Sequence, residues 1–191
     1  MSGQKTVTPT AHSLAASISA TNSRGLPPVH LWHPPFCGDL DMRIARDGTW
    51  FYEGTPIGRP GLIKLFSSIL RKEDEDFFLV TPVEKVRIKV DDAPFVAVDF
   101  DRSGSGREQR LTFVTQVEDR VTAGPGHEIR LERDAVTGEP SPYVHIRAGL
   151  EALIDRKSFY RLVDIGEPHD DWFGVWSGDQ FFRIIPVAEL P

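Results

Sequence analysis

Three potential metal ligands lie close together in the segment HLWHPPFC. His30, His33 and Cys37 fall within eight residues, and imidazole and thiolate are ligands that zinc and other soft or borderline metals prefer. A structural zinc site needs four ligands, and no fourth candidate lies nearby. The two prolines at 34–35 instead indicate an extended connection whose apolar residues pack against a domain. We therefore expect this segment to hold no metal.

Nucleophilic catalysis has two candidates, Ser177 in WSGDQ and Cys37. Neither lies in a nucleophile-elbow pattern, and no motif nearby supplies a base. Ser177-Gly178 is more simply the turn of a hairpin that joins FGVW to QFFRI. The segment GSGR at 104–107 lacks the third glycine of a dinucleotide-binding fingerprint, and no strand-to-helix transition follows it, so we interpret it as a loop. We identify no catalytic residue and expect no cofactor.

A set of polar and aromatic residues could instead bind a small ligand. Arginine can hold a phosphate or carboxylate in bidentate fashion, and tryptophan or tyrosine can stack on a planar base. These residues would approach one another if two similar halves pack together, and such an interface is a favoured place for a ligand cleft. In the structural alternative, the glutamates pair with the arginines and the rings fill the core. The predicted ligand-binding residues are Trp50, Glu53, Thr81, Glu84, Tyr143, Arg147, Arg156 and Trp176.

The segments that would position these residues contain sequence patterns that occur twice in the chain. The phrase DMRIARDG at 41–48 returns as EIRLERDA at 128–135. A second apolar phrase follows each at nearly the same spacing, PGLIKLF from Pro60 and AGLEALI from Ala148. Two phrases kept in order at similar spacing favour an internal duplication. The sequence therefore predicts that the fold is built twice.

Each copy reads as a helix packed on an antiparallel sheet. Asp47-Gly48 between alternating apolar runs predicts a tight hairpin. Apolar residues at helical spacing predict helices at about 60–71 and 148–157, the first ending at the solvated charge cluster RKEDED. Short alternating or β-rich segments, among them FFLVTP, EKVRIKV and FVAVDF, predict the strands. The predicted fold class is α+β: duplicated antiparallel β-rich halves, each with one main helix. The predicted boundaries are an N-terminal tail over 1–26, a first half over 27–105 and a second half over 106–191.

Composition and charge exclude several classes of protein. The chain has 40% hydrophobic and 26% charged residues, as globular proteins do, and a net charge of −6. It therefore lacks the electrostatic footprint of a protein that binds a nucleic-acid polymer. No apolar run approaches the roughly 18 residues that span a bilayer, so we expect no membrane association. A single cysteine rules out an internal disulfide framework and fits a reducing compartment, which makes the cytoplasm the expected location.

The N-terminal tail is rich in serine, threonine and alanine. Its stretch SLAASISA is too short and too polar for a secretory segment. Leu14 and Ile18 would lie on one face of a short helix at 12–20, and disorder is the alternative.

Nearly everything outside the tail resembles a bacterial family. The linked phrases DGTWFYEG, LVTPVEKVRI and DAPFVAV, with PYVHIRAGLEALIDRKSFYRLV and GVWSGDQFF later, are similar to the domain of unknown function 1285 family over about residues 36–185. The resemblance implies a duplicated α+β core and a second half like pleckstrin-homology folds. It also implies a ligand site between the halves, with a nucleotide as a candidate ligand, and a role in bacterial signal transduction. No catalytic mechanism comes with it.

The favoured hypothesis is a non-catalytic module that binds a small anionic ligand, with a nucleotide as a candidate, and reports its state to a protein partner. The alternatives are a small hydrolase or transferase that uses the same cleft and a protein-interaction scaffold without a ligand. The lack of a recognisable nucleophile–base pair favours binding. Because the net charge of −6 repels anions at long range, such a ligand must be held by a few local donors, for which Arg147 and Arg156 are the candidates.

Overall fold

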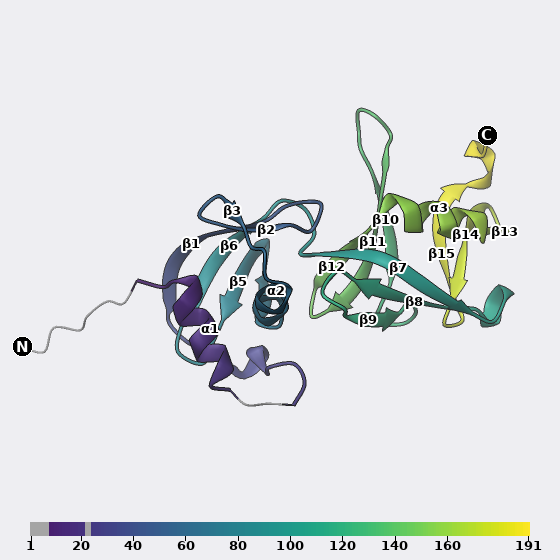
Figure 1. The fold of residues 1–191 in the computed structure, drawn as a ribbon. Coiled ribbons are helices and arrows are strands. Elements are labelled where there is room, and N and C mark those ends of the chain that lie inside the picture. The colour runs from purple at the N-terminus through teal and green to yellow at the C-terminus, as the bar shows by residue number, and fades with distance from the viewer. Residues whose placement is uncertain (1–7, 22–23) are drawn as a thin grey trace, which may run out of the picture. The chain divides into compact units, whose positions relative to one another are not determined.

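The computed structural model describes residues 8–21 and 24–191 (Figure 1). The chain divides into two compact units. Unit 1 comprises Met1–Ala45 and Thr49–Asp91, and unit 2 comprises Arg46–Gly48 and Asp92–Pro191. No helix in the described part of the chain is long and apolar enough to cross a membrane.

Unit 1 is a six-stranded sheet with the strand order β3-β2-β1-β6-β5-β4, accompanied by helices. Two antiparallel meanders build it, β1–β3 and β4–β6, and the first and last strands, β1 and β6, pair in parallel. The two meanders therefore meet at the centre of the sheet. The elements of unit 1 are α1 (Ala11–Ser19), the 3-10 helix η1 (Val29–Leu31), β1 (Phe36–Ile44), β2 (Trp50–Tyr52), β3 (Thr55–Pro56), α2 (Pro60–Ser67), β4 (Leu70–Glu73), β5 (Asp76–Val80) and β6 (Lys85–Val90).

Helix α1 confirms the short helix predicted in the tail. Its first turn is capped by Thr10, whose Oγ1 accepts a hydrogen bond from the backbone N–H of Ser13 at 3.0 Å. Leu14 and Ile18 are buried, at 0% and 5% exposed. Because an isolated helix this short is marginal in water, its apolar face holds it in place, and α1 packs against α2 in unit 1 (Figure 1).

Helix α2 begins as predicted but ends early. Pro60 occupies its first turn, where the fixed φ of proline suits a helix. The helix stops at Ser67 rather than at residue 71, because the chain enters strand β4 at Leu70. The predicted solvated cluster RKEDED is therefore wrong: it supplies β4, a turn in which Asp74 has a φ of +52°, and the start of β5.

Unit 2 repeats the topology of unit 1 in a second six-stranded sheet. Its strand order is β10-β11-β12-β7-β8-β9, again two antiparallel meanders, with β7 and β12 parallel at the centre. Read from β4 to β3, the sheet of unit 1 has the same order, so the predicted duplication is confirmed. The elements of this sheet are β7 (Phe95–Ser103), η2 (Gly106–Glu108), β8 (Arg110–Thr115), β9 (Arg120–Thr122), β10 (Ile129–Arg133), β11 (Pro140–Arg147) and β12 (Leu150–Ile154).

The structure corrects which segments are equivalent. The phrase DMRIARDG lies on β1, the first strand of its sheet, whereas EIRLERDA lies on β10, the fourth strand of the second sheet. The phrase PGLIKLF forms helix α2, whereas AGLEALI forms a turn and strand β12. The duplication is real, but the phrases that suggested it are not its matching parts. The predicted boundary at residue 105 also lies too late, because β7 already belongs to unit 2.

The helix predicted at 148–157 is wrong, because this segment forms a turn, strand β12 and only the start of α3. Ala148 and Gly149 both have positive φ angles, +46° and +76°, which is the backbone of a two-residue hairpin turn. In β12 the buried residues then alternate with half-buried ones, the period of a strand. The helix of unit 2, α3 (Arg156–Asp164), follows β12, and Asp155 caps it by accepting a hydrogen bond from the N–H of Ser158 at 2.8 Å.

A small third sheet completes unit 2. It has the order β13-β14-β15, from β13 (Glu167–His169), β14 (Trp172–Ser177) and β15 (Gln180–Pro186), and is followed by η3 (Val187–Glu189). The hairpin predicted at Ser177-Gly178 is confirmed, but its turn lies one residue later, at Gly178-Asp179, with φ of +56° and +62°, because Ser177 still pairs with Gln180. The expected likeness to pleckstrin-homology folds is not confirmed, since the main sheet contains a parallel pair and α3 precedes three further strands.

Candidate ligand-binding groove

A groove of about 530 Å³ lies in unit 2, between the start of β11 and the first turns of α3. This volume is in the range of sites that bind small molecules. Apolar groups supply much of its wall and two arginines lie along it. The lining residues are Arg46, Glu139, Pro140, Pro142, Leu153, Ile154, Asp155, Arg156, Phe159 and Tyr160.

The start of α3 brings four of these groups to the groove. Asp155 is occupied as the N-cap, which places Arg156 at the first helical position and Phe159 and Tyr160 one turn later. The side chain of Tyr160 stays on the surface, with 59% of the residue exposed. An exposed phenol ring beside an arginine can stack on a planar group.

Arg156 lies at the rim in a weak ion pair. Its Nη2 is 2.9 Å from Oε1 of Glu139, and the two side chains are 74% and 63% exposed. Ion pairs this exposed contribute about 0–1 kcal/mol. An incoming anion can therefore exchange with Glu139 at little cost.

The guanidinium of Arg46 contacts two side chains of unit 2, Asp92 and Ser141. Its Nη1 is 3.3 Å from Oδ2 of Asp92, and its Nη2 donates a hydrogen bond to Oγ of Ser141 at 2.9 Å. The Arg46 side chain is nevertheless 58% exposed. These contacts orient the guanidinium while leaving part of it open to solvent.

Tyr143 supports Arg46 through Asp92. The Tyr143 hydroxyl donates to Oδ1 of Asp92 at 2.7 Å, and the residue is only 3% exposed. Burial, together with this hydrogen bond, raises the pKa of Tyr143 to about 12. The guanidinium of Arg130 lies 4.3 Å from the centre of the phenol ring. Tyr143 thus lies behind the groove rather than in its lining.

Arg147 occupies a different place from Arg156. Its Nη1 is 2.5 Å from Oδ2 of Asp119, and the side chains are 21% and 26% exposed. Its guanidinium also lies 5.0 Å from the centre of the Phe95 ring. Of the two arginines predicted to bind the ligand, only Arg156 lines the groove.

Trp176 lies in an aromatic cluster on the small sheet. The rings of His169 and Phe181 are 4.8 and 5.1 Å from it, and Arg107 lies 5.3 Å from its centre. The residue is 8% exposed. The ring contacts account for its position, and its role in ligand binding stays a prediction.

The predicted site residues of unit 1 have local partners. Trp50 is fully buried and stacks on Phe66 with 6.4 Å between ring centres. Thr81 is also fully buried, and its Oγ1 accepts hydrogen bonds from the backbone N–H groups of Glu84 at 3.1 Å and Val83 at 3.3 Å. Trp50 therefore packs in the core of unit 1 and Thr81 stabilises the turn before β6, and a role of either residue in ligand binding stays a prediction.

The two glutamates of unit 1 differ in environment. Glu53 is exposed in the β2–β3 turn with a φ of +50°. Glu84 is half-buried beside α1, and burial raises the pKa of its carboxyl group, against a hydrogen bond of 3.5 Å from the Ser13 hydroxyl. The ion pairs described for Arg147 and Arg156 are made with Asp119 and Glu139 instead of with these glutamates.

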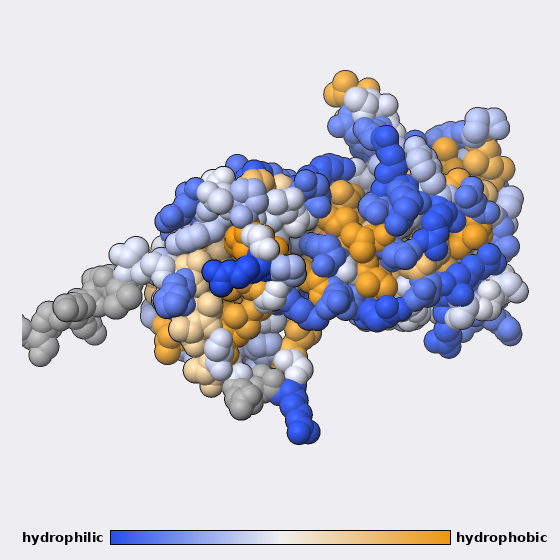
Figure 2. Space-filling view, in the orientation of Figure 1, coloured by the Kyte–Doolittle hydropathy of each residue, from blue (hydrophilic) through white to orange (hydrophobic). Residues whose placement is uncertain are grey.

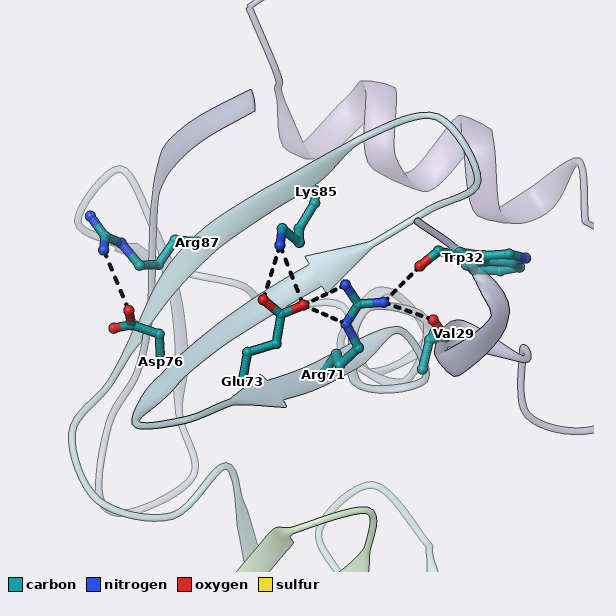
Figure 3. Close-up of polar contacts among 7 residues, drawn as sticks. All are labelled: Val29, Trp32, Arg71, Glu73, Asp76, Lys85 and Arg87. Carbon is teal, nitrogen blue, oxygen red and sulfur yellow. Dashed lines mark hydrogen bonds and ion pairs between the residues drawn. The ribbon is translucent and has the colours of Figure 1, made fainter. Parts of the chain in front are cut away.

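A polar array on the sheet of unit 1 was not predicted (Figure 3). Glu73 accepts from Lys85 Nζ at 2.9 Å and from Arg71 Nε at 2.9 Å, and these contacts, with Lys85 first, lower its pKa. Arg71 also donates to the carbonyls of Val29 at 3.0 Å and Trp32 at 2.8 Å. The array therefore fastens the segment before β1 to strand β4. Arg71 and Glu73 are two residues apart and therefore lie on the same face of a strand, and this spacing of opposite charges is the signal that the sequence analysis missed.

A shallow hollow of about 320 Å³ lies beside this array. Arg87 there donates to Asp39 through two hydrogen bonds of 2.8 and 3.1 Å. It also lies 3.5 Å from Asp76 (Figure 3). The hydrogen bond from Arg87 is the main cause that lowers the pKa of Asp39. These charges satisfy one another, so we assign no ligand to this hollow.

The candidate nucleophiles Ser177 and Cys37 make only local hydrogen bonds. Ser177 is fully buried, and its Oγ accepts from Leu111 N at 2.9 Å and donates to Ala123 O at 2.7 Å. Cys37 is exposed at the start of β1 and donates weakly to Pro35 O at 3.3 Å. Within residues 8–21 and 24–191, no group of three or more histidine, cysteine, aspartate or glutamate side chains is placed to hold a metal ion. That HLWHPPFC is metal-free stays a prediction.

Comparisons with known proteins agree on one family. Residues 27–93 match the model of the N-terminal domain, and residues 94–184 that of the C-terminal domain, of a protein of unknown function, DUF1285. A search of curated proteins found no match.

Two solved structures are similar to this chain. A DUF1285 family protein from Silicibacter pomeroyi DSS-3 is 65% identical, with a TM-score of 0.87 over 92% of this chain and 96% of that one. A DUF1285 family protein from Shewanella baltica OS155 is 31% identical, with a TM-score of 0.52 over 65% of this chain and 91% of that one. With both domain models matched in order and a close structural relative, the chain belongs to the DUF1285 family.

Proposed function

We propose that this protein is a non-catalytic module that binds a small anionic ligand with a planar or apolar part, a nucleotide being the leading candidate, and takes part in bacterial signal transduction. The ligand would lie in the groove beside α3 in unit 2. The observation that carries the proposal is the combination of an apolar wall with Arg46 and Arg156 in a hollow of about 530 Å³.

Charge and shape support this class of ligand. Phosphate and carboxylate groups accept two parallel hydrogen bonds from a guanidinium, an arrangement that ammonium groups cannot reproduce. Phe159 and Tyr160 offer ring surface next to Arg156 for a base or another planar group. One end of the ligand would therefore be held by charge and the other by stacking.

The side chains of the groove favour binding over reaction. The described lining contains no serine, cysteine or histidine. Its carboxylates are engaged, since Asp155 caps α3 and Glu139 pairs with Arg156. A hydrolase or transferase would need an activated nucleophile or a general base aimed into the groove.

Thermal-shift screening followed by calorimetry tests the proposal. A panel of inorganic phosphate, nucleoside monophosphates and cyclic dinucleotides should contain at least one compound that raises the melting temperature, because a ligand that binds only the native state stabilises it by mass action. Arg46→Ala and Arg156→Ala should each weaken that compound's binding by about 10- to 100-fold, the value of one or two charge-assisted hydrogen bonds. Tyr160→Ala should weaken the binding of a nucleotide more than the binding of inorganic phosphate, because only the nucleotide has a base to stack on the ring.

Arg120→Ala is the matched control. Arg120 is also exposed and paired with a carboxylate, Asp101, but it lies on β9 and outside the groove. Its removal should leave affinity unchanged. Equal losses in all three arginine variants, or no loss in any, would discard the groove, and conversion of a bound compound into product would favour the hydrolase or transferase instead.

A further inference from the structure

The rim of the groove is also the base of a projecting hairpin. Strands β10 and β11 are joined by residues 134–139, and this hairpin loop stands out from unit 2 (Figure 1). The loop contains an apolar residue, Val136, which is 94% exposed. Glu139, the last residue before β11, is the partner of Arg156 in the groove. The loop and the groove therefore share one ion pair.

The loop is internally ordered. Oδ1 of Asp134 accepts hydrogen bonds from the N–H groups of Val136 at 2.9 Å and Thr137 at 2.7 Å, and these contacts lower the pKa of Asp134. Gly138 N donates to Asp134 O at 2.9 Å. The backbone N–H of Asp134 also donates to the carbonyl of Glu139 at 3.0 Å and closes the base of the loop. The loop therefore moves as one piece, and the Glu139–Arg156 ion pair is a weak tie between that piece and α3.

We infer that Glu139 is a built-in competitor for the anion, and that the ligand's phosphate or carboxylate displaces it from Arg156 and so frees the loop 134–139 from its ion pair with α3. Ligand occupancy is thereby converted into mobility of the hairpin tip. This inference rests on the proposed function, for which it supplies the means of reporting ligand state.

The exchange is physically inexpensive. Arg156 keeps a charge-assisted hydrogen bond throughout, because one anionic acceptor replaces another. The carboxylate of Glu139 is already 63% exposed and becomes fully hydrated once it is released. Since exposed ion pairs are weak, the competition should change affinity by several-fold rather than by orders of magnitude.

A spin label at the loop tip tests the release without any ligand. Cys37 is the single cysteine, so Cys37→Ser with Val136→Cys provides one labelling position. In the empty protein, Arg156→Ala and Glu139→Gln should each raise label mobility above that of the parent, and Arg120→Ala, which removes an exposed ion pair elsewhere in unit 2, should not. Unchanged mobility in both groove variants would overturn the inference.

Inorganic phosphate is the probe for displacement, with chloride at equal ionic strength as its control. Phosphate should raise label mobility in the parent toward the level of Glu139→Gln, and have no effect on Arg156→Ala. Glu139→Gln should bind phosphate about two- to fivefold more tightly than the parent. Weaker binding by Glu139→Gln would also overturn the inference, because it would make Glu139 a ligand-binding group.

The two proposals fail in different ways. If nucleotides bind but neither they nor phosphate change label mobility, the groove function stands and the release is wrong. If no nucleotide binds but phosphate displaces Glu139, the release stands and the nucleotide is wrong.

Discussion

A chain of three side chains runs from the buried Tyr143 through the half-buried Asp92 to the exposed Arg46, and links the core of unit 2 to the groove. The Tyr143 hydroxyl donates to Asp92 at 2.7 Å, and Asp92 lies 3.3 Å from Arg46. The position of the Arg46 guanidinium therefore depends on a phenol that stays protonated. Removing that proton would place a second negative charge against Asp92.

The pKa of Tyr143 predicts a loss of stability at alkaline pH. Burial and the contact with Asp92 raise it to about 12, while in the unfolded chain the phenol ionises near its ordinary value of about 10. Because the folded state holds the proton more tightly, the contribution is complete below about pH 10 and is lost as the pH rises toward 12. The free energy of unfolding should fall by about 1–2 kcal/mol from this group, after allowance for solvent screening.

Tyr143→Phe isolates the effect from the other groups that titrate in this range. At pH 8 the variant should be less stable than the parent by about 1 kcal/mol, the worth of the lost hydrogen bond. Near pH 12 the difference should vanish or reverse. Urea unfolding at a series of pH values measures it, and a difference that does not change between pH 8 and 12 would contradict the assignment.

At the scale of elements, the β11–β12 turn sets where strand β12 begins. Both of its residues have positive φ, which suits Gly149 but strains Ala148. Ala148 is exposed, so a longer polar side chain fits there. The Asn-Gly pair is the favoured sequence for such a two-residue turn.

Ala148→Asn should therefore stabilise unit 2 by about 0.5–1 kcal/mol, since asparagine tolerates the left-handed conformation better than alanine. Gly149→Ala is the opposing control and should destabilise by about 1 kcal/mol or more, because it introduces a Cβ at a φ of +76°. Denaturant midpoints of both variants check the signs. A loss of stability in Ala148→Asn would mean that the turn is not of this type.

For the molecule as a whole, the net charge is negative, whereas the charges that line the groove include two arginines. The chain carries a net charge of −6, while the groove offers Arg46 and Arg156 to an anion. Hydrophilic residues cover most of the viewed surface of unit 2, with apolar groups showing between them (Figure 2). Under the proposed function, long-range repulsion would oppose the approach of an anion, and the two arginines would retain it.

This opposition predicts an unusual salt dependence. The Debye length falls from roughly 30 Å at 0.01 M salt to about 8 Å at 0.15 M, so added salt screens the distant acidic groups first. Association of a bound nucleotide should accelerate a few-fold over this range, and its dissociation should also accelerate as the arginine contacts weaken. Stopped-flow rates measure both, with the phosphate-free nucleoside as the control that should show no salt dependence. Slower association at higher salt would show that the arginines dominate the potential at long range.

Local patterns in the sequence determined much of this protein. Alternating apolar segments became strands, Asp47-Gly48 lies in a hairpin turn, and a second hairpin turns at Gly178-Asp179, one residue later than predicted. Leu14 and Ile18 marked helix α1. Each of these signals depends on residues within one element, where a period of 2 or 3.6 reports which face is buried. Family membership followed from the same linked phrases. The sequence also indicated the duplication, although through phrases that are not equivalent in the fold.

Tertiary structure alone decided the remainder. The short run AGLEALI suits a helix or a strand equally well by its composition, and its pairing with β7 and β11 settled the choice. The parallel pairs β1 with β6 and β7 with β12 join segments far apart in the chain, so no local period reports them. The groove also depends on segments that are far apart in the chain. Arg156 at the start of α3 was predicted to bind the ligand, but Arg46 and Glu139 were not. Only the folded chain brings the β1–β2 turn and the base of the β10–β11 hairpin, which carry these two residues, next to α3. Burial of apolar faces selects which distant elements meet, and that selection is a property of the whole chain.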